Sequence, residues 1–144
     1  RKAIADDVRP TDLHNVPYEK AHAFLKQFFG DGCGMPEHKL GKGISRVLLK
    51  GDEIISCFVG WPKSPDVFEV IRLGTLPEQR GLWVTPWLLG DGARQAFEEG
   101  HTTISFYTDE STYPDFIKIA RNNDAKYVMS TRAMSLDFVT PWPA

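Results

Sequence analysis

Residues 72–89 decide the fold, and they read RLGTLPEQRGLWVTPWLL. An apolar run ends here at Pro77, because proline has no N–H to donate to a strand ladder. Gly81 supplies a tight turn, and Pro86 is tolerated in the first turn of the helix that follows. A strand–turn–helix junction of this kind presents unpaired backbone N–H groups at a helix N-terminus, where anions bind. The segment therefore predicts an anion-binding turn.

Before this junction, the sequence predicts a helix and three strands. Apolar residues recur at spacings of three and four over Tyr18–Phe29, which is typical of an amphipathic helix packed on a sheet. Ile44–Leu49 and Glu53–Gly60 are apolar, β-branched-rich runs joined by a Lys-Gly-Asp turn, so they predict a hairpin. Val67–Leu73 is the third strand. The glycine-rich segment 30–43 is predicted as a loop on the substrate side.

Beyond the junction, helices and strands alternate. Thr85–Glu99 is predicted as a helix that stops at the glycine after it. A strand over Thr102–Tyr107 and a short helix over Pro114–Asn122 follow. Two further strands, Tyr127–Met129 and Ala133–Phe138, are predicted to close the sheet.

The segment Leu76-Pro77-Glu78-Gln79-Arg80-Gly81 resembles the signature of the GNAT superfamily of N-acetyltransferases. In that family a central strand runs into such a turn, whose amides hold the pyrophosphate of acetyl-coenzyme A. The order of helices and strands is similar to the family's over nearly the whole chain. The resemblance implies a single GNAT-like domain over residues 1–144, of class α/β (α+β), with the acyl-CoA N-acyltransferase fold. Its mixed, mostly antiparallel central sheet would carry helices on both faces and splay between Val67–Leu73 and Thr102–Tyr107.

The same resemblance implies acetyl-coenzyme A (acetyl-CoA) as cosubstrate. The resemblance implies that residues at the end of the central strand, in the turn and at the start of the helix bind this cosubstrate. They are Gly74, Thr75, Leu76, Gln79, Arg80, Gly81, Leu82, Trp83, Val84 and Thr85. The family's six-residue turn pattern falls on residues 78–83 and is matched strictly only by Gly81. Glu78 puts a negative charge where a polyanion binds, and Trp83 puts an indole beside the backbone. We therefore predict weaker binding of coenzyme A than in a typical family member.

Glu69 is the candidate general base, because it lies on the predicted central strand, where many members of the family have a glutamate. A carboxylate there either faces the substrate cleft or is buried with a raised pKa, and a raised pKa suits deprotonation of an ammonium. The alternative is a solvated residue on the polar face of the strand. The family's usual acid, a tyrosine, is replaced by Ala120, so Tyr113 is the candidate substitute. The alternative for Tyr113 is a loop or cap residue.

Composition limits the partners that we expect. The 144 residues are 42% hydrophobic and 25% charged, with a formal net charge of −2, and the basic residues form no cluster, so no nucleic-acid partner is predicted. No apolar run approaches the roughly 18 to 20 residues of a membrane span, and residues 1–7 lack a signal-peptide core, so we predict a cytoplasmic protein with no membrane partner. The two cysteines and four histidines lack metal-ligand spacing, so no metal site is predicted.

Two classes of function fit these observations. The first, implied by the resemblance, is an N-acetyltransferase, monomeric or homodimeric, that acts on a small-molecule or protein amine. The second is a GNAT-fold protein without turnover that binds a protein partner, which the departures at Glu78, Trp83 and Ala120 favour. The run Phe116-Ile117-Lys118 resembles divergent GNAT-like proteins of tailed bacteriophages. We favour the enzyme, because the family is overwhelmingly catalytic and positioning alone lowers a barrier by up to about 7 to 11 kcal/mol.

Overall fold

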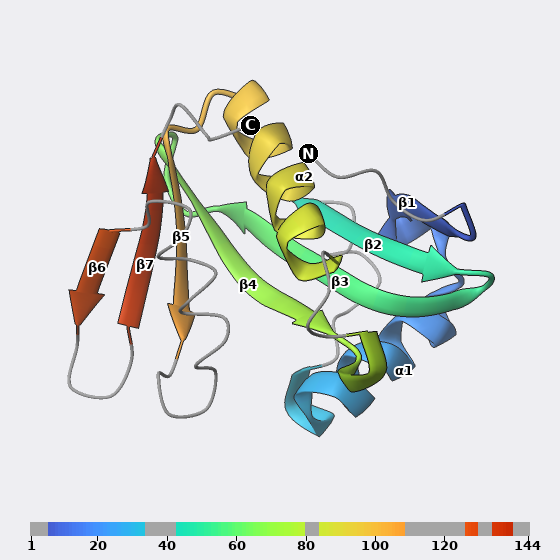
Figure 1. Cartoon of the computed structure of the whole chain (residues 1–144). Helices are drawn as coiled ribbons and strands as arrows, with labels where there is room; N and C mark the ends of the chain where they lie inside the picture. Colours follow the sequence, from blue (N-terminus) through green and yellow to red (C-terminus); the bar gives the residue numbers. More distant parts are fainter. Residues whose placement is uncertain (1–5, 34–42, 80–83, 109–125, 130–133, 140–144) are drawn as a thin grey trace.

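The computed structural model describes residues 6–33, 43–79, 84–108, 126–129 and 134–139. These residues form a seven-stranded sheet with two α-helices (Figure 1). In chain order the strands and α-helices are β1 (Val8–Asp12), α1 (Tyr18–Phe29), β2 (Ile44–Lys50), β3 (Glu53–Pro62), β4 (Val67–Thr75), α2 (Val84–Glu98), β5 (Thr103–Thr108), β6 (Lys126–Met129) and β7 (Met134–Val139). Short 3-10 helices are η1 (Leu13–Asn15), η2 (Asp31–Cys33) and η4 (Pro77–Gln79).

The strand order in the sheet is β1-β2-β3-β4-β5-β7-β6. Neighbouring strands are antiparallel except β4 and β5, which are parallel. This confirms the predicted mixed, mostly antiparallel sheet. The predicted hairpin is β2 and β3, and its turn contains Gly51 at φ 61°, a left-handed conformation that favours glycine. Both helices that flank the central strands were also predicted correctly, to within about one residue at each end.

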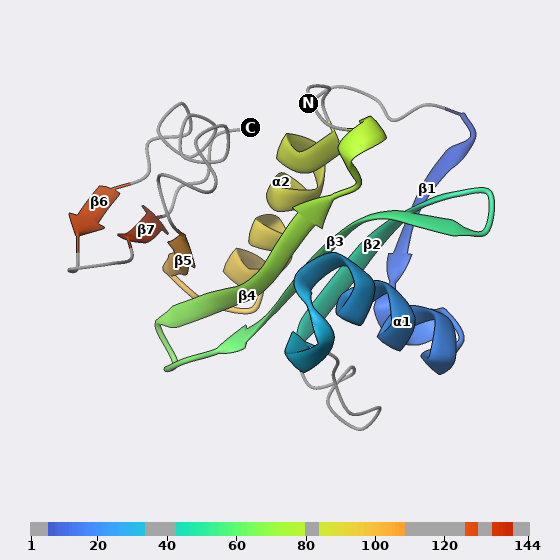
Figure 2. The same ribbon diagram turned by 90° about the horizontal axis from the view of Figure 1, so that it is seen from below.

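The two helices cover opposite faces of the sheet (Figure 2). On the α2 face, Leu88 packs in one buried cluster with Phe58 and Phe68 of the sheet. On the α1 face, Leu25 belongs to a second cluster. Each such side chain contributes about 1.5 to 3 kcal/mol on burial. Close approach of α2 depends on Gly92, because a Cβ there would lie 2.5 Å from the Phe58 ring.

Strand β1 is the one described strand that the sequence analysis did not predict. Only Val8 of its five residues is buried, so its sequence shows no run of apolar side chains. Pro10 lies within it and removes one N–H from the ladder. The strand still forms because β2 is its single partner, and an edge strand tolerates proline.

The sheet splays between β4 and β5, as predicted. The two strands pair only over Val67–Val70 and Thr103–Phe106. Beyond that point β4 continues along β3, whereas β5 diverges with β7 as its partner (Figure 1). The splay widens toward the C-terminal end of β4, which is also the end at which α2 begins.

Some sequence predictions fall outside the described residues. They are the short helix Pro114–Asn122 and positions 34–42 of the glycine-rich loop. The described start of that loop forms η2. Among the helices that are described, none has the length and apolar character needed to cross a membrane.

Candidate functional site

A bulge in β4 decides which face of the sheet its side chains occupy. The register with β3 skips Ile71, which is therefore an extra residue in β4. Phe68 and Val70, before the bulge, pack beneath α2. Simple alternation would put Arg72 on that face as well. Instead, the guanidinium carbon of Arg72 lies 5.7 Å from the ring centroid of Phe29 in α1, so the bulge turns this arginine to the α1 face.

The bulge lies where β5 leaves β4, and it exposes backbone groups to the splay. In an antiparallel pair, alternate residues direct both backbone polar groups at the partner strand. The N–H of Leu76 donates to the carbonyl of Ile55 at 2.9 Å, so by alternation Gly74 also faces β3. Leu73 therefore directs its N–H and C=O to the side that β5 has left. An open strand edge is a surface on which the amides of an extended ligand pair.

Three hydroxyl groups join the end of β4 to the start of α2. Ser56 Oγ donates to the Gly74 carbonyl at 2.9 Å and lies 2.8 Å from Thr75 Oγ1. Thr75 Oγ1 lies 2.6 Å from Thr85 Oγ1. Each hydroxyl can donate one hydrogen and accept others, so the three groups form one connected chain from the Gly74 carbonyl to Thr85. The structure thus brings together two of the predicted cofactor residues, Thr75 and Thr85.

The N-terminus of α2 offers backbone donors beside this hydroxyl chain. The N–H groups of Val84 and Thr85 lie in the first turn and have no acceptor within the helix. Pro86, next in sequence, has no N–H to leave unpaired. The helix dipole adds about half a positive charge at this end, and the first turn contains no acidic residue. Backbone amides of this first turn are therefore donors available to an anion, beside the hydroxyl of Thr85.

Other predicted cofactor residues have structural contacts of their own. Gly74 lies beneath Phe28 of α1, whose ring would collide with any Cβ at this position. Leu76 packs against the cluster under α2, and its carbonyl accepts the N–H of Gln79 at 2.9 Å. The predicted residues of the turn itself lie outside the described part of the chain: Arg80, Gly81, Leu82 and Trp83. Contact of these residues with a cofactor stays a prediction.

Glu69 lies on the α1 face at the narrow end of the splay. In the strand register it is opposite Trp61 of β3 and Ser105 of β5. Its side chain is 23% exposed, and Oε2 lies 3.8 Å from Nζ of Lys63. The carboxylate is therefore neither fully solvated nor sealed in the core, and Glu69 lies one residue before the last described pair of β4 with β5. The candidate acid, Tyr113, lies outside the described residues, so its role stays a prediction.

An ion-pair network on the other face fixes α2 against the sheet. The buried carboxylate of Asp91 in α2 accepts hydrogen bonds from Arg46 Nε and Arg94 Nη2, each at 2.9 Å. Arg46 also donates from Nη1 to Asp12 Oδ1 at 3.1 Å. Burial opposes the charge of Arg46, but the two carboxylates outweigh it and raise its pKa above the usual value.

Sequence reasoning missed the bulge, the hydroxyl chain and the network around Asp91. Ser56 and Thr75 are far apart in the chain, and only the register of β3 with β4 brings them together. Asp91 did carry a signal, because it is a charged residue in the apolar stretch of α2. Among the described residues, no group of three or more histidine, cysteine or acidic side chains is arranged to hold a metal ion.

No protein-family model and no curated protein sequence matches the chain. Solved structures do match. An aminoglycoside 6′-N-acetyltransferase complexed with coenzyme A has a TM-score of 0.73 and 13% identity, with 95% of this chain and 99% of that chain covered. The GNAT domain of S. lividans PAT has a TM-score of 0.71 and 17% identity, with coverages of 92% and 89%. A GNAT family acetyltransferase from Elizabethkingia anophelis with acetyl-CoA bound has a TM-score of 0.63 and 14% identity, with coverages of 94% and 99%.

The chain therefore has the GNAT fold, which confirms the fold expected from the sequence. Sequence identities this low establish the fold alone. The function has to be argued from the chemistry of the site.

Proposed function

We propose that the chain transfers an acetyl group from acetyl-CoA to the amine of a small molecule or protein. The observation that carries the proposal is the splay between β4 and β5, with Glu69 at its narrow end and the N-terminus of α2 at its wide end. These two ends would supply a proton acceptor and an anion site, and both groups assist acyl transfer from coenzyme A. Coenzyme A or acetyl-CoA in two of the structural neighbours supports the proposal.

In this proposal the pyrophosphate binds at the start of α2. The amides of Val84 and Thr85 would donate to it together with those of the turn, residues 80–83. The pantetheine amides would pair with the open edge of β4 near Leu73 and Thr75. That arrangement leads the thioester from the wide end of the splay to the bulge at Ile71, close along the strand to Glu69.

The reaction is a direct displacement. The amine nitrogen attacks the thioester carbonyl carbon, the new C–N bond forms and the C–S bond breaks. Glu69 takes the proton released by the nitrogen, directly or through a water molecule. The coenzyme A thiolate leaves with the bonding electron pair and is protonated by an acid, for which Tyr113 is the candidate in the sequence. Positioning of the two reactants contributes up to about 7 to 11 kcal/mol, and each proton transfer about 10² to 10⁴ in rate.

The test of this proposal is Glu69→Gln, with acetyl transfer to a panel of amines as the readout. Glutamine keeps the size of the side chain and removes the proton acceptor. We expect the rate to fall by about 10² or more, the affinity for coenzyme A to stay the same, and the acidic limb of the pH–rate profile to disappear. The matched control is Glu53→Gln, since Glu53 is an exposed glutamate at the far end of β3.

A small effect of Glu69→Gln would remove Glu69 from the mechanism and leave catalysis by positioning. Absence of both acetyl-CoA binding and thioester hydrolysis in the native protein would overturn the enzyme altogether. The protein would then be a binding module, as the departures at Glu78, Trp83 and Ala120 suggest. Exposed tryptophans would be the first candidates for the partner surface of such a module. Trp87 is not one of them, because it is buried in the cluster under α2.

A further inference from the structure

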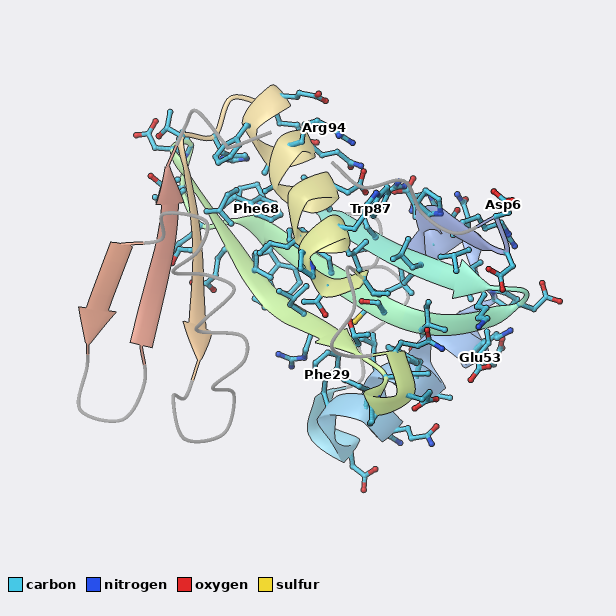
Figure 3. The ribbon with its side chains drawn as sticks, in the orientation of Figure 1. Asp6, Phe29, Glu53, Phe68, Trp87 and Arg94 are labelled. Atoms are coloured by element: carbon cyan, nitrogen blue, oxygen red, sulfur yellow. The ribbon has the colours of Figure 1, made fainter. Side chains whose placement is uncertain are left out.

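Arg72 is a half-buried cation beside the proposed reaction site. It follows the bulge in β4 and lies on the same face of the sheet as Glu69. Its guanidinium carbon lies 5.7 Å from the ring centroid of Phe29, which is close enough for a cation–π contact. Figure 3 shows Phe29 near the C-terminal end of β4, where the splay is wide.

The hydrogen bonds of Arg72 leave one edge of the guanidinium unused in the described part of the chain. Nη1 donates to the carbonyl of Ile71 at 2.7 Å. Nε is buried and has no hydrogen-bond partner among the described residues, none of whose carboxylates forms an ion pair with Arg72. Nε and Nη2 share the edge that binds a carboxylate through two parallel hydrogen bonds. That edge is therefore the one for which the described chain provides no acceptor.

An unpaired cation in this place is costly. Arginine stays protonated at all relevant pH values, so burial cannot neutralise it. The cation–π contact with Phe29 offsets only part of this cost, and it leaves the hydrogen-bond donor at Nε without an acceptor. Arg72 keeps part of its surface in solvent, so an incoming anion can approach the guanidinium, and pairing with the buried Nε requires the side chain to move.

The surroundings of Arg72 are apolar. Phe28, Phe29, Trp61 and Ile71 all lie on this face, and three of them pack against the cluster around α1. A ligand complementary to this face would have an amine near Glu69, a carboxylate at Arg72 and an apolar portion in contact with the aromatic rings. α-Amino carboxylates with apolar side chains have this combination of groups.

We infer that Arg72 recognises a carboxylate on the acceptor, so that the acceptor class is an amine with a neighbouring carboxylate and an apolar side chain. The amine part of this inference rests on the proposed acetyl transfer. The anion part rests on Arg72 alone and is testable without turnover. The two parts therefore fail separately.

The first experiment measures ligand binding at Arg72 by its side-chain Nε–H resonance, which is assigned by its loss in Arg72→Gln. The probes are 3-phenylpropionate and the neutral 3-phenylpropanamide, which have the same shape. We expect a saturable shift of the resonance with the carboxylate and none with the amide. Equal shifts with both probes, or no shift with either, would overturn the inference, because Arg72 would then not recognise the carboxylate group.

The second experiment measures acetyl transfer to matched acceptors that differ only in the carboxylate. The pairs are phenylalanine with phenethylamine, and leucine with isopentylamine. We expect kcat/KM to favour the amino acid, and Arg72→Gln to lower it about 10- to 100-fold for the amino acid while the amine is little changed. Arg9→Gln, at an exposed arginine of β1, should change neither. The affinity for coenzyme A should be the same in all variants.

Two results separate the inference from the proposed function. Transfer to the bare amines without preference for the carboxylate, or weaker coenzyme A binding in Arg72→Gln, overturns the role of Arg72 and leaves acetyl transfer standing. A carboxylate-specific shift of the Arg72 resonance without any acetyl transfer keeps the anion site and removes the enzyme. Acetyl-CoA binding with no transfer to any member of the panel overturns the acceptor class.

Discussion

Arg46 and Arg72 lie on opposite faces of the same sheet, and they differ in whether a carboxylate pairs with the guanidinium. Arg46, on the α2 face, has carboxylates of Asp91 and Asp12 at 2.9 and 3.1 Å. Arg72, on the α1 face, has no carboxylate partner in the described residues. Both side chains are half-buried, so exposure does not explain the difference.

The difference separates a structural face from the face to which we assign the reaction, called the reactive face below. Among the described residues of the α2 face, Arg46, Asp91 and Arg94 pair with one another, and this network fixes the helix whose N-terminus forms the proposed anion site (Figure 3 shows Arg94 on this helix). The buried Nδ1 of His101, beside Phe68, is the atom of this face that lacks a hydrogen-bond partner there. On the α1 face Glu69 and Arg72 remain partly open beside the splay. Glu69 has Lys63 as a partner, but the buried Nε of Arg72 has none among the described residues, and such a polar atom is characteristic of a ligand site.

The largest expected effect concerns Cys57, directly beneath this reactive face. Burial raises the pKa of Cys57 to about 12, against the smaller opposing effects of Arg72 and the Gly74 backbone. The thiolate is the reactive form, so at pH 8 the native thiol should be alkylated about a thousandfold more slowly than in urea-unfolded protein. Peptide mapping after iodoacetamide treatment measures this rate for each cysteine. Equal rates in native and unfolded protein would show that the α1 face is open below Arg72 as well.

The next effect concerns the α2 face. Asp91→Ala leaves Arg46 and Arg94 without their shared buried carboxylate, so we expect a loss of about 3 kcal/mol in the free energy of unfolding. For a chain of this length that corresponds to a fall of about 6 to 12 °C in Tm. Glu98→Ala on the same helix is the control, since its 4.0 Å pair with Arg94 is exposed and contributes about 0 to 0.5 kcal/mol. If both variants were equally stable, the α2 face would not be the structural one.

The smallest effect concerns the turn before α2. Glu78 is exposed and acidic, and the sequence places Trp83 where the family has a small residue. The double variant Glu78→Gln, Trp83→Gly should bind coenzyme A about tenfold more tightly, because it removes a repulsive charge and a bulky side chain. Calorimetry of both proteins measures this. Unchanged affinity would show that the two side chains point away from the phosphates.

The fold was predictable from the sequence because its signals are local. The apolar spacing in Tyr18–Phe29 and the turn at Gly51 each specify an element from adjacent residues. Pro77 likewise marked the junction of β4 with α2, and β4 ends at Thr75. Strand β1 was missed because an edge strand with Pro10 has no such local pattern.

The site was predictable only in part. Glu69 was a candidate because a charge inside an apolar strand is visible in the sequence, and its role as the base stays a prediction. The position of Arg72 was not predictable, because simple alternation puts it beneath α2, and only the bulge at Ile71 turns it to the other face. The hydroxyl chain from Ser56 to Thr85 depends on strand register, which the sequence does not specify at this precision.

The central claim is that the splay between β4 and β5 binds acetyl-CoA, and calorimetric titration of the native chain with acetyl-CoA tests it most directly. We predict binding of one molecule per chain with a dissociation constant below about 1 mM, which corresponds to about −4 kcal/mol or better. Competition by coenzyme A at the same stoichiometry would agree with a pyrophosphate site at the start of α2. No heat of binding at millimolar acetyl-CoA would contradict the claim.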